Sequence, residues 1–203
     1  MTHNIDKIIY INLNKREDRK LSIENELEKY GFKNYERFEA IETKGFGIVG
    51  CTMSHLSVLK IAKERNYKNI LILEDDFVFS VNKTKFDILL DGFFQLEIPF
   101  DVCMLSYNMI QNKPTEYSII NQVVEAQAAS GYIVNNHYYD TLINLYEKSF
   151  PLLETTKQHW IYANDQIWKQ LQKKDLWYYF VERIGKQIAG YSDIGEQYTE
   201  NNW

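Results

Sequence analysis

Residues Asn69–Asp76 read NILILEDD, a continuous apolar run that ends in three consecutive carboxylates. A short apolar run without polar interruption is typical of a strand buried on both faces, as in the parallel sheets of α/β proteins. In such sheets, ligands bind beyond the carboxyl ends of the strands. We therefore expect a buried strand at Asn69–Leu73 that delivers the acidic triplet, Glu74–Asp76, to the edge of a ligand site.

The acidic triplet places like charges at neighbouring positions, where they repel one another unless a cation offsets them. If the chain stays extended, Glu74 and Asp76 point to one side and Asp75 to the other. Carboxylate oxygens suit Mg²⁺ and Mn²⁺, which commonly bridge one or two carboxylates to ligand phosphates. The alternative for the same residues is a solvated turn at a strand end, without a metal.

Outward from this strand, apolar runs alternate with segments of helical periodicity. Strands are expected at Lys7–Leu13, Tyr35–Ala40, Phe77–Phe79, Phe100–Ser106, Val123–Ala128, Gly131–Asn135 and Leu176–Glu182, and helices at Asp18–Tyr30, Thr52–Arg65, Lys85–Phe94, His137–Tyr146 and Ala163–Lys173. Residues 108–117 are expected to form a surface loop. The alternation predicts an α/β fold with a mostly parallel central sheet, a single domain over residues 1–203, and a tail at 184–203 that closes the site.

The composition narrows the function classes. The chain has 203 residues with a formal net charge of −5, which argues against a nucleic-acid partner. It lacks a signal-peptide pattern and a membrane-spanning apolar run, so we expect a cytoplasmic protein with at most peripheral membrane contact. Its two cysteines form neither a disulfide framework nor a zinc-ligand pattern, and its 15% aromatic content suits stacking on sugars or bases.

Two further segments accompany the acidic triplet: Ile11–Arg19, INLNKREDR, and Gly47–His55, GIVGCTMSH. In order and spacing, the three segments resemble glycosyltransferase family 25, which includes bacterial lipooligosaccharide sugar transferases and collagen hydroxylysine galactosyltransferases. Weaker similarities follow at Ser130–Asn135, Asn164–Trp168 and Tyr191–Ile194.

The resemblance implies a GT-A fold, one Rossmann-like domain, and inverting transfer of a hexose from UDP-galactose or UDP-glucose. The acceptor would be a hydroxyl of a glycan, as in lipopolysaccharide biosynthesis, or of a glycoprotein. The acidic triplet would be the family's variant of the D-x-D motif of GT-A enzymes. Asp76 would ligate Mn²⁺ or Mg²⁺, Asp75 would meet the ribose or the metal shell, and Glu74 would support the loop or the nucleotide.

The first motif supplies candidate donor contacts. Asn12 closes a strand, where its amide suits a uracil edge, although a turn-capping role fits equally. Leu13 stands beside it in the same motif. Arg16 and Arg19 are spaced to approach a diphosphate, since guanidinium groups bind phosphate bidentately. A solvated helix face is a better alternative for Arg19 than for Arg16.

The resemblance implies that Ser54 and His55 of the second motif belong to the donor pocket, whereas a lone helical histidine is more often structural. Cys51 is interpreted as a small buried packing residue.

An inverting transfer needs a carboxylate that accepts the acceptor's proton. Asp165 is the first candidate, although a helix cap explains it equally well, and Asp193 is the second. No histidine follows His159, so a third metal ligand is open between Asp193 and water. Aromatic residues around Asp165, namely Trp160, Tyr162 and Trp168, are expected to form the acceptor platform.

Three alternatives remain. The first is a nucleotide-sugar-binding module that has lost catalysis. The second is a Mg²⁺-dependent phosphohydrolase, disfavoured because Asn12 and Asn14 stand where an early nucleophilic Asp is needed. The third is a structural α/β interaction protein, which leaves the motifs unexplained.

Overall fold

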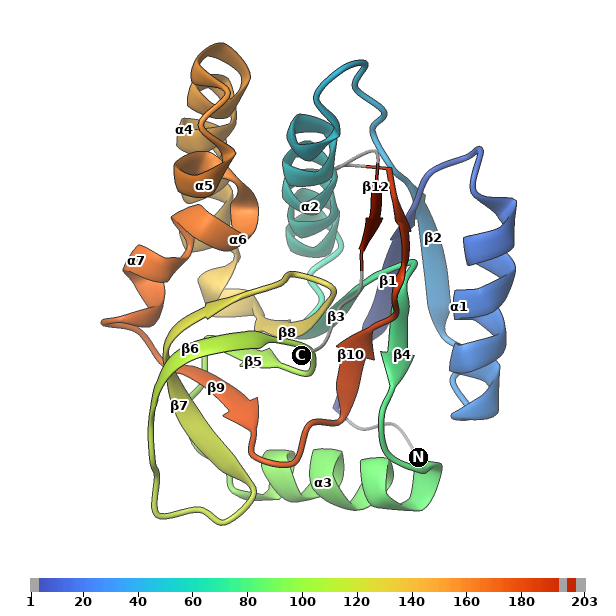
Figure 1. The fold of residues 1–203 in the computed structure, drawn as a ribbon. Coiled ribbons are helices and arrows are strands. Elements are labelled where there is room, and N and C mark those ends of the chain that lie inside the picture. The colour runs from blue at the N-terminus through green and yellow to red at the C-terminus, as the bar shows by residue number, and fades with distance from the viewer. Residues whose placement is uncertain (1–3, 194–196, 200–203) are drawn as a thin grey trace.

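The computed structural model describes residues 4–193 and 197–199 and contains a central sheet of eight strands (Figure 1). The sheet order is β2-β1-β3-β8-β5-β9-β7-β6. The bounds are β1 Lys7–Asn12, β2 Tyr35–Glu39, β3 Asn69–Glu74, β5 Val102–Met104, β6 Asn108–Lys113, β7 Ile120–Gln127, β8 Gly131–Asn135 and β9 Trp177–Phe180. Their pairings make all strands except β7 and β8 run in one direction. The expected mostly parallel sheet is therefore confirmed.

Helices cover both faces of this sheet (Figure 1). Helices α1 (Glu17–Lys29) and α3 (Lys83–Gln95) lie on one face, and α2 (Gly47–Glu64) and α4 (Tyr139–Thr156) on the other. A single 3₁₀ turn, Asn136–Tyr138, precedes α4, and three short helices follow it: α5 (His159–Tyr162), α6 (Asn164–Ile167) and α7 (Lys169–Gln172).

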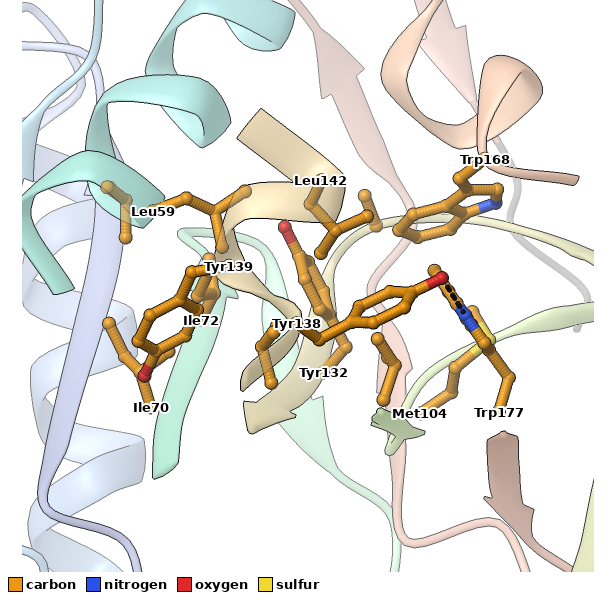
Figure 2. Packing of buried hydrophobic residues seen from close by; sticks show 14 of the residues in the cluster. Leu59, Ile70, Ile72, Met104, Tyr132, Tyr138, Tyr139, Leu142, Trp168 and Trp177 are labelled. Atoms are coloured by element: carbon orange, nitrogen blue, oxygen red, sulfur yellow. Dashed lines mark hydrogen bonds between the residues drawn. The ribbon is translucent and has the colours of Figure 1, made fainter. Parts of the chain in front are cut away.

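Strand β3 is buried on both faces, as its sequence predicts. Ile70 and Ile72 pack toward α2 and α4, whereas Leu71 and Leu73 pack toward α1 and α3. Figure 2 shows the first of these two cores, where Ile70 and Ile72 lie near Leu59 of α2. Since the apolar groups on each side are removed from water, this strand anchors the end from which the acidic triplet emerges.

Aromatic residues fill much of the core in Figure 2. Trp168 and Trp177 are fully buried, and the Trp177 indole donates a hydrogen bond to Tyr138 Oη at 3.1 Å. The Trp168 indole donates to the carbonyl of Ala126 at 3.0 Å. The expectation that Trp168 belongs to an acceptor platform is wrong, because its ring and its N–H are both used inside the core.

Three predicted elements differ in the structure. Part of the 108–117 loop is strand β6, which pairs irregularly with β7 at the sheet edge. Its residues are half-buried or exposed, so they lack the apolar alternation that identifies a strand. The helix expected over Ala163–Lys173 divides into α6 and α7, because the chain tightens at Trp168, where Leu171 N bonds to Trp168 O at 2.8 Å. The helix that starts near His137 continues to Thr156, past Pro151.

The C-terminal segment lies beside the acidic triplet. Strand β10 (Gly185–Gln187) pairs with β4 (Phe77–Phe79), and β11 (Gly190–Ser192) pairs with β12 (Gln197–Thr199). A Cβ on Gly185 would stand 2.2 Å from the Phe77 ring, so glycine permits this close pairing. Residues 194–196, which include Ile194, and residues 200–203 of the expected tail lie outside the described residues.

Among the described residues, none of the helices has the length and apolar character needed to cross a lipid bilayer.

Candidate active site

A pocket of about 340 Å³ opens beyond the carboxyl ends of β1 and β3. Its walls come from four parts of the chain: Ile11, Leu13, Lys15 and Arg19; residues 40–45 with Gly47 and Cys51; the acidic triplet; and Gln187, Ser192 and Asp193. The pocket therefore lies where the sequence places a ligand site, at the strand ends. The C-terminal segment forms one wall.

Arg19 joins two members of the acidic triplet. Its Nη1 atom lies 3.0 Å from Asp75 Oδ1 and 3.3 Å from Asp76 Oδ2, and Nη2 donates to the Tyr191 carbonyl at 2.7 Å. The alternative of a solvated helix face for Arg19 is therefore wrong, because the first turn of α1 faces the strand ends. Arg19 thus supplies a cation inside the pocket.

Arg16 is placed next to the pocket but not among its lining residues. Its guanidinium pairs with the Asp193 carboxylate, and Nη2 lies 2.8 Å from Asp18 Oδ2. Lys15 lines the pocket, with Nζ 3.5 Å from Asp193 Oδ1 and 2.8 Å from Glu42 Oε1. The Asp193 carboxylate therefore lies between Lys15 and Arg16, two cations that would otherwise be available to bind an anionic ligand.

Asp76 is the most unusual carboxylate of the site. It is 7% exposed, and Gln187 Nε2 donates to its Oδ2 atom at 2.8 Å. Its buried Oδ1 atom has no hydrogen-bond partner. Burial, with repulsion from Glu74, raises the pKa of Asp76 to about 7. Burial also raises the pKa of Asp75. A hard divalent cation fits this arrangement, because it would satisfy the free oxygen and offset the repulsion.

Glu74 points away from the other two carboxylates, toward α2. Its Oε1 atom lies 3.0 Å from His55 Nε2 and 3.7 Å from Cys51 Sγ. The expected pairing of Glu74 with Asp76 on one side is wrong, since β3 ends at Glu74 and a turn replaces the extended chain. Asp75 and Asp76 instead share Arg19.

His55 is fully buried behind Glu74 and does not line the pocket. Its Nδ1 atom lies 2.8 Å from Tyr132 Oη, so both ring nitrogens are in contact with polar partners. Cys51 lines the pocket rather than serving only as packing. Burial, together with the charges of Glu74 and Asp165, raises the pKa of the Cys51 thiol well above its usual range, which argues against a thiolate nucleophile.

Asn12 positions Asp75 from behind. Its Nδ2 atom donates to Asp75 Oδ2 at 2.7 Å and to the Arg16 carbonyl at 3.0 Å, and its Oδ1 accepts from Arg37 Nε at 2.9 Å. These contacts use both amide hydrogens. Asn12 is not among the pocket-lining residues, whereas Leu13 is.

Ser54 shapes the pocket wall without reaching it. Its hydroxyl donates to the Gly50 carbonyl at 2.7 Å and accepts from Ile41 N at 2.9 Å. Gly50 allows the same close approach, because a Cβ there would lie 2.0 Å from the Ile41 carbonyl oxygen. The G-x-x-G-C-x-x-S-H segment thereby holds residues 40–45 against the start of α2.

Asp165 lies near the pocket but does not line it. It lies in the first turn of α6, and its Oδ2 atom accepts from Ala128 N at 3.2 Å. Burial raises its pKa, and the charge of Glu74 acts in the same direction. The structure therefore gives Asp165 both a local hydrogen bond and an environment that favours holding a proton.

Two parts of the site carry no sequence signal that identifies them. Gln187, which contacts Asp76, lies in a segment with little periodicity. Residues 40–45 form a pocket wall although only Gly45 marks them as a loop. Lys15 belongs to the first motif, whose basic character indicates an anion site.

The model of Glycosyltransferase family 25 (LPS biosynthesis protein) matches residues 45–168, more than half of the chain. The chain belongs to glycosyltransferase family 25. The matched residues of this family 25 chain include the second motif, the acidic triplet and Asp165.

A protein of Acanthamoeba polyphaga mimivirus, named "Putative glycosyltransferase R655", is 32% identical over a region that covers 37% of this chain and 30% of that protein. The family 25 chain therefore aligns with less than a third of that relative's length.

Two solved structures share the fold. A197 from STIV superposes with a TM-score of 0.51 at 10% identity, over 85% of this chain and 80% of A197. Mannose-1-phosphate geranyltransferase from Thermus thermophilus gives a TM-score of 0.52 at 6% identity, over 91% and 76% of the two chains. With the family match, these likenesses confirm the predicted α/β domain of the GT-A type.

Proposed function

We propose that this family 25 chain is a metal-dependent, inverting glycosyltransferase that moves a hexose, galactose or glucose, from a UDP-sugar to a glycan or glycoprotein hydroxyl. One observation carries the proposal: three consecutive carboxylates line a pocket at the strand ends, and one buried oxygen of Asp76 has no partner. A phosphohydrolase would need an early nucleophilic carboxylate, and β1 ends in Asn12 instead.

The donor's anionic part would bind among the cations of the first motif. Lys15 and Arg19 line the pocket, and Arg16 lies beside it. Guanidinium and ammonium groups stabilise a diphosphate through charge-assisted hydrogen bonds. In the structure, Asp193 pairs with Arg16 and Lys15. We propose that the diphosphate competes with the Asp193 carboxylate for these two cations.

Asp76 and Asp75 would hold Mn²⁺ or Mg²⁺, with Arg19 fixing both carboxylates and Gln187 fixing that of Asp76. The cation would supply positive charge where UDP departs, which lowers the barrier if it is felt more in the transition state than in the ground state. Glu74 is directed to His55, so it supports the turn instead of joining Asp76.

Asp165 is our proposed general base. A base works best when its pKa lies near the working pH, and burial raises the pKa of Asp165 in that direction. The Ala128 amide would hold the carboxylate in one orientation while it accepts the acceptor's proton. Asp193 is less suited, because its carboxylate is already engaged in ion pairs with Lys15 and Arg16.

The test is UDP release from UDP-galactose and UDP-glucose, with and without Mn²⁺ and glycan acceptors. We expect Mn²⁺-dependent turnover that Asp76→Asn abolishes and that Asp140→Asn, at an exposed ion pair with Lys63, retains. Asp165→Asn should lower kcat by roughly 10²-fold or more with little change in UDP affinity. Binding of UDP-sugar without any turnover would instead make the chain a binding module, and full activity of Asp76→Asn would refute the metal assignment.

A further inference from the structure

A second group of potential metal ligands lies at the base of the pocket, apart from Asp75 and Asp76. Cys51 and His55 are four residues apart on α2 and therefore share one helix face. Glu74 meets them from the end of β3. One ligand atom from each residue lies within 4.8 Å of the other two.

Two of the separations among these atoms are close to the edges of a zinc coordination tetrahedron. With Zn–S near 2.3 Å and Zn–N and Zn–O near 2.1 Å, tetrahedral angles give edges of about 3.6 Å for S···O and about 3.4 Å for N···O. The observed separations are 3.7 Å from Cys51 Sγ to Glu74 Oε1 and 3.0 Å from His55 Nε2 to the same oxygen. The first separation is within about 0.1 Å of its edge and the second is about 0.4 Å shorter, and the sulfur and the nitrogen lie within 4.8 Å of each other, so small side-chain shifts would bring the three atoms around one ion.

The surroundings of His55 have the features of a metal-ligand environment. Tyr132 Oη lies 2.8 Å from Nδ1, and a partner at that nitrogen leaves Nε2 directed at Glu74. Both Tyr132 and His55 are fully buried, so the imidazole is held in one orientation. Cys51 and Glu74 line the pocket, which provides a path for an ion and an open fourth position.

We propose that Cys51, His55 and Glu74 bind one thiophilic divalent cation such as Zn²⁺, at a site separate from the hard-cation site at Asp76. On binding, the Cys51 thiol loses its proton to solvent, and His55 ligates through Nε2 as the neutral ring. The fourth position would be filled from the pocket by water or by an anionic oxygen of a ligand. Sulfur and imidazole nitrogen select Zn²⁺ over Mn²⁺ or Mg²⁺, so the two sites differ in ion preference.

The probe is Co²⁺, titrated into the tag-free full chain without any nucleotide, followed by displacement with Zn²⁺. We expect one equivalent of Co²⁺ to produce thiolate-to-metal charge-transfer absorption and tetrahedral visible bands, both removed by Zn²⁺. Cys51→Ser should abolish the charge-transfer absorption. Cys103→Ser is the matched control, since Cys103 is buried in the core on the opposite face of the sheet, and it should leave the spectrum unchanged.

Tyr132→Phe tests the supporting contact. It keeps the ring and removes only the hydroxyl beside His55, and we expect roughly 10–100-fold weaker Co²⁺ affinity. The proposal is overturned if no cysteine-dependent absorption appears, or if the absorption persists in Cys51→Ser. Asp76→Asn should retain the Co²⁺ spectrum while losing Mn²⁺-dependent UDP release, so failure of this site and failure of the proposed transferase activity can be told apart.

Discussion

Replacement of Asp76 by asparagine should stabilise the metal-free protein at neutral and alkaline pH while it removes activity. The Asp76 carboxylate is buried, one of its oxygens has no hydrogen-bond partner, and Glu74 lies two positions before it in the chain. Asparagine has nearly the same shape without the charge. It therefore relieves the repulsion within the acidic triplet, at the cost of the ion pair with Arg19.

The magnitude follows from the pKa of Asp76, which rises from 3.8 to about 7 on folding. Because the folded state holds its proton more tightly, it loses stability relative to the unfolded state as pH rises from about 4 to about 7. Each unit of pKa difference corresponds to about 1.4 kcal/mol, so the full effect above neutral pH is as much as about 4 kcal/mol. The Asp76→Asn variant should not lose this stability as the pH rises, because asparagine does not ionise.

Urea denaturation in the presence of EDTA measures the effect, at about pH 4 and at about pH 8 to bracket the transition. The variant-minus-wild-type difference in the free energy of unfolding should be small at the lower pH and favour the variant at the higher pH. Without EDTA, free Mn²⁺ at about 100 times its Kd should stabilise the wild type by about 2.7 kcal/mol and leave the variant unchanged. A variant that is less stable than the wild type at both pH values would refute the reasoning.

Three further outcomes are expected. Gly50→Ala places a Cβ 2.0 Å from the Ile41 carbonyl oxygen, so it should destabilise the protein by about 1–3 kcal/mol in urea denaturation and weaken UDP binding in calorimetry, because the pocket wall must move. Asp193→Asn removes one ion pair each from Lys15 and Arg16, so the donor KM should fall several-fold, and a drop in kcat of roughly 10² would instead identify Asp193 as the base. Trp160→Ala, at an exposed ring on α5, should raise the acceptor KM more than it weakens UDP binding, and equal losses for both would contradict an acceptor platform there.

Local patterns were sufficient for most of the sheet. Strands such as β1 and β3 are short, apolar and bounded by polar turns, so their periodicity identifies them without reference to the rest of the chain. Edge strand β6 is the exception, since an edge strand has one hydrogen-bonding side and little buried surface to impose a pattern. Its pairing with β7 decides its conformation.

Local sequence patterns did not predict which residues of the motifs line the pocket. Arg16 and Arg19 are alike in sequence, yet only Arg19 enters the pocket, because the direction in which α1 leaves β1 sets the face it presents. Asn12 is predicted to contact the donor and His55 to belong to the donor pocket, and in the structure they contact Asp75 and Glu74. Such roles depend on distances between residues that are far apart in the chain.

The sequence by itself determined that an apolar strand ends in the acidic triplet, within the ordered motifs of family 25. These are local features, since the apolar pattern of a strand and the order of the motifs can be recognised from residues that are close in the sequence. Tertiary structure alone decided that Glu74 turns from Asp76 toward Cys51 and His55, and that Gln187, 111 residues farther along, contacts Asp76. Those contacts arise where the ends of β3, α2 and β10 meet, and no local pattern encodes such a meeting.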